Sequence, residues 1–369
     1  MCISTAQAQT SIPEDNQSAI VFTYFHIGDD LMPSANLRKE QFEAQLAEIK
    51  EQNYKVLSLD DLAKALKEGQ SLPDPAIALT FDGAHKGTLD YAAPLLLKAG
   101  LPFTIFVATD TLDAPSGDNL GWDDIRKLAK HSLVTIGLLP AAYQTLASKD
   151  PAEISRQINK AVARYRQELS GEPRFFAYPY GESSTAYKEI VQQQGFVAAF
   201  GQQSGVSYAG ADMFLLPRFS LTESYGDLER FRLTARALPL PVTDISPKDP
   251  YVKDANPQIG FTVSDKLIQD IKTLSCFSST SEKARIQIIS KNRVEIRLEK
   301  PFEDERGRVN CTMAGPMDES GEQQRWRWFG MMLSIPVSYD DYEPAANGSS
   351  DEDSNLANQL QTTIDVQPE

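Results

Sequence analysis

Between residues 19 and 240, short apolar segments alternate with helical segments, and this rhythm constrains the fold more than any other feature. Within residues 37–52, for example, Phe42, Leu46 and Ile49 recur at helical spacing. Alternation with short connections marked by Gly or Pro is typical of parallel βαβ units. About seven strands favour an α/β barrel, whose chemistry lies on loops at the carboxyl ends of the strands. The expected strands are 19–24, 55–59, 76–81, 103–107, 133–136, 175–177, 196–200 and 215–218.

Residue types near the segment ends predict where the helices begin and end. Asn36 is the expected cap of the helix at 37–52, and Asp60 is the expected cap of the next helix, which should end at Gly69. Further helices are expected at 88–98, from 123, at 152–169, at 184–194 and at 227–237.

The rhythm changes at residues 238–241, and the following segments alternate with period two. Such a period is typical of half-buried antiparallel strands, so a small β-sandwich of about 95 residues is expected. The alternating segments are 286–289, 294–298, 309–312 and 326–329. The predicted division is a leader or linker at 1–18, a barrel at 19–240, a β-rich domain at 241–338 and a disordered acidic tail at 339–369.

Composition excludes several classes of protein. The 369 residues include 36 basic and 51 acidic ones, a net charge of −15. Eight acidic residues and no basic residue lie in 340–369, which leaves −7 for the rest of the chain. A negative body without a basic block argues against a nucleic-acid partner. Three histidines and three cysteines exclude a zinc-finger protein, and no apolar run approaches the roughly 18 residues of a membrane helix.

The start of the chain and its cysteines indicate a compartment. Ala6 and Ala8 match the small-residue pattern at which signal peptidase cuts, although no apolar stretch precedes them. If a shortened secretory signal ends there, Cys2 is removed, and Cys276 and Cys311 could pair in an oxidising compartment. The protein would then be periplasmic or secreted. The alternative is two buried thiols in a cytosolic protein.

Candidate chemistry gathers where expected strands end. Asp82 ends the apolar run 76–82, and the sequence Tyr178-Pro179-Tyr180-Gly181-Glu182 follows the strand 175–177. With Tyr24 at the end of the first strand, these residues would form a groove with aromatic platforms suited to sugar rings. Alternatively, Asp82 is a helix cap and the Tyr-Pro-Tyr-Gly turn is an ordinary rigid loop.

In its order of motifs, residues 19–240 resemble the polysaccharide deacetylase family, which has the NodB homology domain. The motifs that carry the resemblance are 24–30, 77–82, 102–107, 134–137 and 176–182. The C-terminal region also looks like the β-domain that accompanies some members. The resemblance implies a distorted seven-stranded (β/α) barrel and metal-dependent removal of N-acetyl groups from polysaccharides, which is hydrolysis of a C–N bond other than a peptide bond.

The family's catalytic residues carry over only in part. Asp82 matches the general base, and Tyr180 matches the tyrosine whose backbone N–H helps to hold the oxyanion. The three metal-ligand positions, however, hold Gly83, Leu139 and Tyr143. Gly lacks a side chain, Leu lacks a donor atom and a neutral Tyr is a poor zinc ligand. The resemblance therefore implies no bound zinc or other cofactor in this chain.

Two other family positions also differ. Ala177 stands where many members have an arginine that tunes the base, and residues 215–217 offer no histidine for the general acid.

Three hypotheses about function follow from this resemblance. The first is a pseudoenzyme that binds polysaccharide or oligosaccharide with N-acetyl groups through Tyr24, Tyr178, Pro179, Gly181 and His85, with Asp82 and Tyr180 left from the catalytic set. The second is an active N-deacetylase with a rearranged site that uses Asp82 and His85, with His26 as a further possible ligand. The third is a structural or partner-binding role in polysaccharide assembly, with protein partners unknown.

Overall fold

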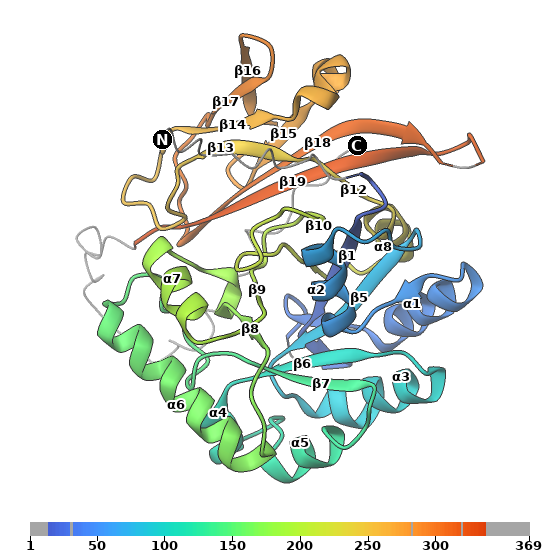
Figure 1. The fold of residues 1–369 in the computed structure, drawn as a ribbon, viewed down its shortest axis with the longest axis vertical. Coiled ribbons are helices and arrows are strands. Elements are labelled where there is room, and N and C mark those ends of the chain that lie inside the picture. The colour runs from blue at the N-terminus through green and yellow to red at the C-terminus, as the bar shows by residue number, and fades with distance from the viewer. Residues whose placement is uncertain (1–13, 30–31, 282, 319, 337–369) are drawn as a thin grey trace, which may run out of the picture.

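A curled sheet of nine strands forms the larger part of the protein (Figure 1). The computed structural model describes residues 14–29, 32–281, 283–318 and 320–336. The predicted acidic tail at 339–369 and most of the predicted leader therefore lie outside the described residues. The sheet runs in the order β10-β1-β5-β6-β7-β8-β9, with β11 beside β1 and β4 beside β5. Its strands are β1 (Ser18–Tyr24), β4 (Lys55–Val56), β5 (Ala76–Asp82), β6 (Phe103–Val107), β7 (Val134–Leu138), β8 (Phe175–Ala177), β9 (Ala198–Phe200), β10 (Ser207–Tyr208) and β11 (Phe219–Ser220).

The strands from β1 through β5 to β9 pair in parallel, which confirms the predicted distorted (β/α) barrel. All residues of β5 and β6 are buried, as expected for strands covered on both faces. The segment 215–220 lies between the two ends of the curled sheet. It forms a parallel bridge from Leu216 to Phe200 on β9 and pairs Phe219 with Phe22 on β1. The strand predicted at 215–218 thus lies further along the chain, as β11.

The helices cover the outside of the barrel (Figure 1). The predicted cap Asn36 lies instead in a short strand, β3 (Asn36–Leu37), which pairs with β2 (His26–Ile27), and the first helix begins after Arg38. Ser58, not Asp60, caps the second helix, because its hydroxyl accepts the Asp61 N–H. Gly69 ends that helix in the left-handed conformation, as predicted. The helices are α1 (Lys39–Glu51), α2 (Leu59–Glu68), α3 (Ala93–Ala99), α4 (Thr109–Asp113), α5 (Trp122–Leu128), α6 (Pro151–Leu169), α7 (Thr185–Gln193) and α8 (Leu228–Ala235).

Two four-stranded sheets follow the barrel, as the period-two segments predicted. Their orders are β12-β19-β18-β15 and β13-β14-β17-β16. All their pairs are antiparallel except β12 with β19. The strands are β12 (Leu238–Pro239), β13 (Val242–Ser246), β14 (Ile259–Val263), β15 (Ser275–Ser278), β16 (Arg285–Ile289), β17 (Arg293–Arg297), β18 (Arg306–Met317) and β19 (Gln324–Ser334).

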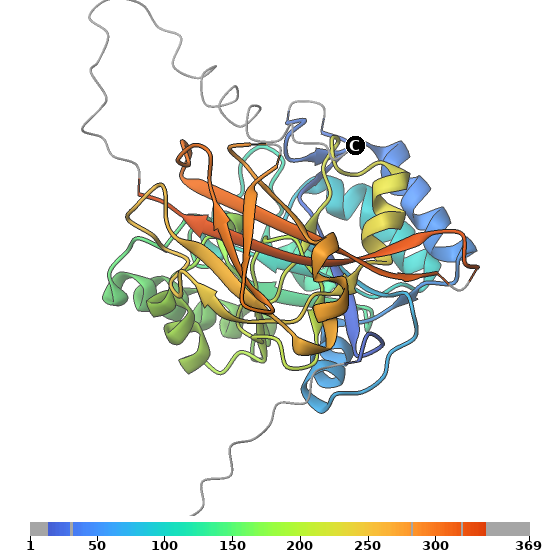
Figure 2. The ribbon, with the colours of Figure 1, turned by 90° about the horizontal axis from the view of Figure 1, so that it is seen from above.

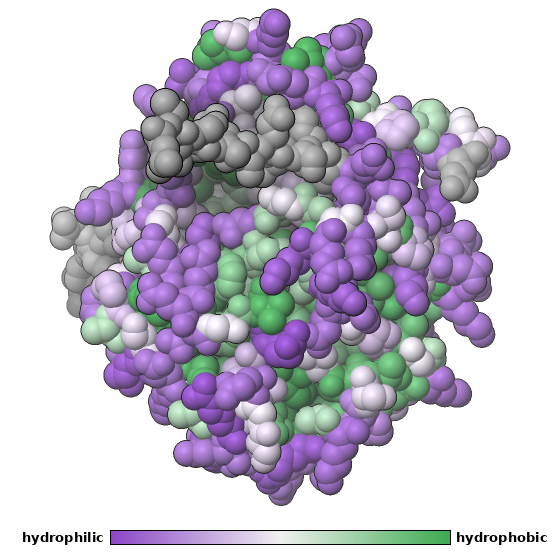
Figure 3. All heavy atoms as spheres, viewed as in Figure 1, coloured by the Kyte–Doolittle hydropathy of each residue, from purple (hydrophilic) through white to green (hydrophobic). Residues whose placement is uncertain are grey.

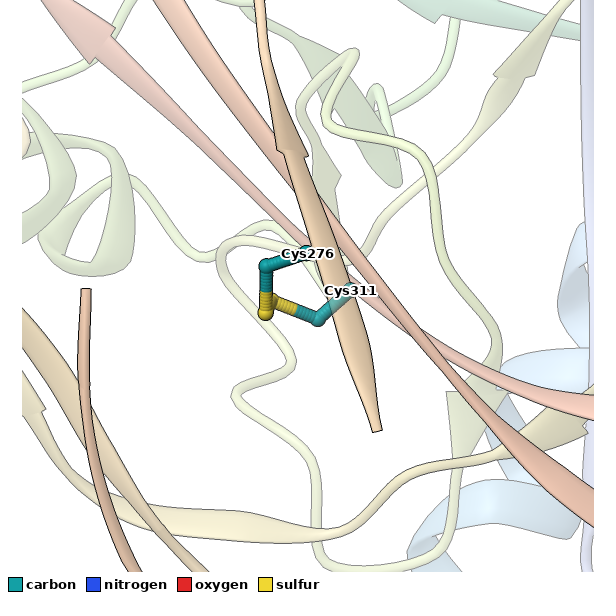
Figure 4. Close-up of a disulfide and its surroundings, with 2 residues drawn as sticks. All are labelled: Cys276 and Cys311. Carbon is teal, nitrogen blue, oxygen red and sulfur yellow. A yellow bond between two sulfur atoms is a disulfide. The ribbon is translucent and has the colours of Figure 1, made fainter. Parts of the chain in front are cut away.

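The predicted disulfide joins β15 to β18 (Figure 4). Cys276 and Cys311 lie directly opposite each other in the ladder, and both are completely buried in the core between the two sheets. The bond therefore closes a loop with a sequence separation of 35 residues inside the sandwich.

The long β18–β19 hairpin packs along the side of the barrel (Figure 2). Near the start of β19, Arg327 forms a two-pronged ion pair with Asp15, with N–O distances of 2.6 and 2.8 Å. Further along β19, the Trp328 ring packs edge-on against Phe219 of β11. Close to the end of β19, Met332 reaches the turn that contains Gly181. The sandwich is thus fixed to the barrel along most of one strand.

The face shown in Figure 3 is mostly hydrophilic, with apolar side chains visible between the barrel elements in the lower half of the view. None of the helices described by the structure combines the length and apolar character required to cross a bilayer.

Candidate functional site

Asp82 lies in the centre of the barrel, at the carboxyl end of β5, and its side chain is 0% exposed. Its two carboxylate oxygens each accept a hydrogen bond from the Arg218 guanidinium, at 2.6 Å from Nη1 and 2.6 Å from Nη2. The Gln202 amide donates a further, longer bond at 3.3 Å. The residue predicted as the general base is therefore held in a buried two-pronged ion pair.

Arg218 reaches Asp82 from the segment that closes the barrel, and it is also completely buried. Its Nε donates to the Gly201 carbonyl at 2.8 Å. Its Nη1 lies 3.2 Å from the hydroxyls of both Thr23 and Thr80. The flat faces of Phe106 and Phe200 flank the guanidinium, with centroids 5.4 and 6.0 Å from Cζ. Rings and hydrogen bonds together compensate for burying this charge.

Arg218 is the main site residue that the sequence reasoning missed. The resemblance placed an arginine for the base at position 177, where this chain has Ala177, and Arg218 supplies the same charge from the segment directly before β11. A signal was present, because Arg218 stands alone in the apolar stretch Leu215-Leu216-Pro217-Arg218-Phe219 of a strand expected to be buried. A lone charge in such a strand requires a buried partner of opposite sign.

Gly83 occupies the first expected metal-ligand position, and this position does not accommodate a side chain. Its φ of +85° lies in the left-handed region, and its N–H donates to the Phe106 carbonyl. A Cβ at this position would lie 2.4 Å from Nε2 of His85. The imidazole of His85 therefore occupies the space in which a ligand side chain would begin.

The two other ligand positions contribute hydrocarbon and a neutral phenol. Leu139 is completely buried and packs in the core with Phe106 and Phe200. Burial raises the pKa of the Tyr143 phenol well above its ordinary value, and the nearby Asp82 carboxylate raises it further. A phenol that keeps its proton offers no anionic oxygen to a metal. Gly83, Leu139 and Tyr143 thus do not fit zinc, whose protein ligands are thiolate, imidazole and carboxylate.

The Tyr-Pro-Tyr-Gly turn follows β8 and carries the exposed aromatic ring of the site. Tyr180 has a φ of +56°, an unusual value for a residue with a side chain, and it is 37% exposed. Its ring meets Tyr143 edge-on at 5.3 Å and lies 5.4 Å from the Arg306 guanidinium. Pro179 is buried, and a Cβ at Gly181 would lie 2.5 Å from Met332 and from the Gln202 backbone.

Two of the tyrosines predicted to bind substrate lie in the core, which is a correction to the expected groove. Tyr24 is buried between Phe81 and Phe42, and its hydroxyl donates to Gln45. The Tyr178 ring is completely buried, and its hydroxyl donates to the Phe214 carbonyl at 2.9 Å. A ring enclosed by protein has no free face for a sugar, and among Tyr24, Tyr178 and Tyr180 only Tyr180 has a partly exposed ring.

His26 and His85 form a stacked pair, with ring centroids 3.7 Å apart. Nδ1 of His26 lies 3.2 Å from the Asp29 carboxylate. Burial, and then the adjoining His26, lower the pKa of His85 to about 3, so this imidazole is neutral at physiological pH. In the described part of the chain, no three His, Cys, Asp or Glu side chains converge as a metal-binding group, and Asp82 is paired with Arg218 rather than with either histidine.

Arg306, which the sequence reasoning did not include in the site, joins Glu182 at the end of the Tyr-Pro-Tyr-Gly turn where the sandwich meets the barrel. Glu182 accepts a hydrogen bond from the Thr145 hydroxyl and lies 3.5 Å from Arg306 of β18. Burial raises the pKa of Glu182. Arg306 thus contacts both Tyr180 and Glu182, and the sandwich contributes a cation to the rim of the candidate site.

Comparisons with known proteins agree with this architecture. Residues 69–199 match the polysaccharide deacetylase family. A poly-β-1,6-N-acetyl-D-glucosamine N-deacetylase of Escherichia coli K12 is 22% identical over 333 residues, which cover 74% of this chain and 48% of that protein. The Staphylococcus aureus MSSA476 protein of the same name is 21% identical over 215 residues, covering 55% of this chain and 73% of that protein. The chain thus spans about half the length of its E. coli relatives.

Solved structures share the barrel. The Streptococcus pyogenes deacetylase PplD, in complex with acetate, superposes with a TM-score of 0.55 at 19% identity, over 61% of this chain and 99% of PplD. IcaB from Ammonifex degensii gives a TM-score of 0.56 at 19% identity, over 61% of this chain and all of IcaB. Residues 69–199 therefore match the polysaccharide deacetylase family within a barrel that these solved structures share, with Gly83, Leu139 and Tyr143 at the positions where the family resemblance places the metal ligands.

Proposed function

We propose that this protein binds N-acetylated polysaccharide through a deacetylase barrel that no longer hydrolyses it. The observation that carries the proposal is the state of Asp82, whose carboxylate is completely buried and paired with Arg218. A general base must lie within hydrogen-bond reach of the water that it activates. With its carboxylate enclosed and the neighbouring ligand positions filled by Gly83, Leu139 and Tyr143, the barrel lacks the means to activate that water.

Saccharide binding draws support from the residues that remain accessible. Tyr180 presents a partly exposed ring at the rim, with the Arg306 guanidinium over one side and the Tyr143 ring in a T-shaped contact with it. Such rings suit the apolar faces of sugars, and nearby charged groups can bond to hydroxyl and acetamido groups. The curated relatives are named for poly-β-1,6-N-acetyl-D-glucosamine, so a polymer of this class is the first ligand to test.

Retained hydrolysis through a rearranged site is the second candidate, and one observation favours it. Nδ1 of His85 is buried without a hydrogen-bond partner among the described residues, and the imidazole is neutral. A neutral imidazole with an unpaired nitrogen can accept a hydrogen bond from a group that enters the site, so a rearranged site with Asp82 and His85 is the form that this candidate takes. The two candidates differ in whether acetate is released.

The disulfide supports an oxidising compartment. Disulfides persist in secreted and periplasmic proteins and are rare in the cytosol of mesophiles. Cys276 and Cys311 are joined within the sandwich core. The proposed location is therefore the periplasm or the cell exterior, where envelope and extracellular polysaccharides lie.

The test combines metal titration, acetate release and saccharide binding on the full chain. We expect no stoichiometric zinc site by calorimetry, no acetate release from N-acetylglucosamine oligomers, and binding that Tyr180→Ala abolishes. Tyr91→Ala is a matched control, because Tyr91 is also a partly exposed ring beneath a cation, Lys39, but on the outside of the barrel. A tight zinc site with acetate release would replace the proposal by an active enzyme. Equal binding by Tyr180→Ala and the parent would remove the barrel rim as the binding site.

A further inference from the structure

A groove of about 480 Å³ lies away from the barrel rim, between α8 and the turn of the β18–β19 hairpin. In Figure 1 the hairpin extends beyond β12 and passes beside α8. The volume falls in the range typical of small-ligand sites, which is roughly 300–1,000 Å³. None of the residues that line this groove corresponds to a catalytic or metal-ligand position named above for the family.

One wall of the groove is a face of α8 and the residue that follows it. Glu229, Arg232, Leu233 and Arg236 lie three or four positions apart, so their side chains share one side of the helix. Leu233 is 38% exposed, which is unusual for a leucine in a helix that packs on a barrel. The wall therefore combines an accessible apolar side chain with charged groups.

The other wall is the hairpin, where Trp326 faces the groove together with Gln323 and Asp318. The Asp318 carboxylate is held in place by the Ser320 hydroxyl and by the backbone N–H groups of Glu322 and Gln323. These hydrogen bonds lower the pKa of Asp318. The turn thus presents a fixed carboxylate beside an aromatic ring.

The three arginines of the groove are already paired with carboxylates within the protein. Arg232 bonds to Glu48 at 2.7 Å, and Arg236 lies 3.9 Å from Asp318. Arg325 donates to the Arg236 carbonyl at 2.9 Å and forms a two-pronged pair with Asp74. Because each arginine has a carboxylate partner, a polyanion would have to break these pairs. A neutral ligand with apolar faces and many hydroxyl groups fits the groove better.

We infer that this groove is a second saccharide-binding subsite, with Trp326 as its stacking platform. The inference rests on the proposed function, since it assigns a second contact to the same class of polymer. Trp326 lies six residues before Met332, which touches the turn beside Tyr180. At about 3.4 Å per residue, the two sites are on the order of 20 Å apart along β19. A long oligomer could contact both, whereas a disaccharide could contact only one.

The test titrates a disaccharide and a hexasaccharide of N-acetylglucosamine into the full chain and each variant by calorimetry, and in the parent chain also follows tryptophan fluorescence. The chain has three tryptophans, and Trp122 and Trp328 are only 6% and 8% exposed, so Trp326 is the one that a surface ligand should perturb. We expect Trp326→Ala to weaken hexasaccharide binding about tenfold, because the second contact of a linked ligand raises its affinity. Disaccharide affinity at the barrel rim should change less than about twofold.

Two further variants separate binding from folding. Leu233→Asp places a charge in the groove from an exposed helix position and should weaken hexasaccharide binding to the same extent. Ile288→Ala removes an equally exposed apolar side chain from β16, away from the groove, and should have no effect. Thermal unfolding of each variant identifies any loss that comes from misfolding, and Leu233→Asp decides the matter if Trp326→Ala is unstable.

The outcomes also separate this inference from the proposed function. If Trp326→Ala and Leu233→Asp both bind the hexasaccharide as strongly as the parent, the subsite is overturned. If Tyr180→Ala abolishes binding in that case, the proposed function still stands. Binding lost in Trp326→Ala but unchanged in Tyr180→Ala supports the groove and overturns the barrel rim. A groove that responds to peptides and to no saccharide overturns the subsite as well.

Discussion

Arg218→Met removes the guanidinium that neutralises Asp82 in the centre of the barrel. The carboxylate would stay buried and lose two hydrogen bonds of 2.6 Å, while the Gly201 carbonyl would lose its 2.8 Å donor. Removing one partner of a buried ion pair costs about 3–5 kcal/mol, because the other charge is left uncompensated. We therefore expect the free energy of unfolding to fall by about 3–5 kcal/mol, well above the ~1 kcal/mol of an ordinary substitution.

The assay is urea unfolding followed by circular dichroism, with the midpoint compared at an unchanged slope. Arg174→Met is the matched control, because Arg174 pairs with Asp60 on the surface, where the side chains are 55% and 43% exposed. An exposed pair of this kind contributes about 0–1 kcal/mol. Both pairs join an arginine to an aspartate, so the difference between the two losses in the free energy of unfolding measures the effect of burying the pair.

A double-mutant cycle with Asp82→Asn then isolates the pair itself. Each single change leaves one charge buried without its partner, whereas the double variant buries no charge. The double variant should therefore lose at least about 2 kcal/mol less than the sum of the two single changes. If Arg218→Met costs no more than Arg174→Met, or if the two single effects simply add, the argument that Arg218 holds Asp82 is refuted.

Three further predictions concern the sandwich and the ligand position. Replacing Cys276 and Cys311 by serine should lower the free energy of unfolding by about 3–4 kcal/mol in the chain-entropy treatment of a 35-residue loop, and an unchanged urea midpoint would contradict this. Gly83→Asp should destabilise the chain without creating a zinc site, because its φ is +85° and His85 fills the space, and His85→Ala in the same chain should recover part of the loss. The pKa of His85 is lower in the folded chain than in the unfolded chain, so protons bind preferentially to the unfolded chain. The contribution of neutral His85 to the free energy of unfolding is therefore complete above pH 6.5 and is lost as the pH falls toward about 3. His85→Gln should therefore flatten the fall of the urea midpoint across that interval, and an unchanged pH profile would exclude His85 as its source.

The elements of the barrel could be predicted from the sequence because hydrophobic periodicity and length determine them. The strands at 103–107 and 175–177 lie where the apolar runs placed them. The starts of helices were less predictable, since Asn36 has a good capping side chain but uses it elsewhere. Its amide donates to Glu223, and its side-chain oxygen accepts the Asp29 N–H. Glu223 lies 187 residues and Asp29 lies 7 residues from Asn36 in sequence. A prediction from local propensity cannot include a partner as distant as Glu223.

The sequence predicted several of the residues that lie at the candidate site, but not which of them are buried or what they contact. The motif order located Asp82 and Tyr180, but burial decided which tyrosines present a free ring, and the packing of Tyr24 against Phe42 depends on a helix that the strand pattern does not position. The partner of Asp82 lies 136 residues further along the chain. The groove beside α8 could not be predicted from the sequence either, because it forms only where the β18–β19 hairpin of the sandwich packs beside the barrel.

The buried pair between Asp82 and Arg218 also bears on how such a chain evolves. If the barrel no longer hydrolyses its ligand, as proposed above, Asp82 is not selected as a general base, yet substitution of Asp82 alone would leave the Arg218 charge in the core without its partner. Selection for folding is then enough to retain both residues over many generations. The Thr-Phe-Asp motif can therefore persist in descendants that have lost the reaction, so its presence in a sequence does not by itself indicate turnover.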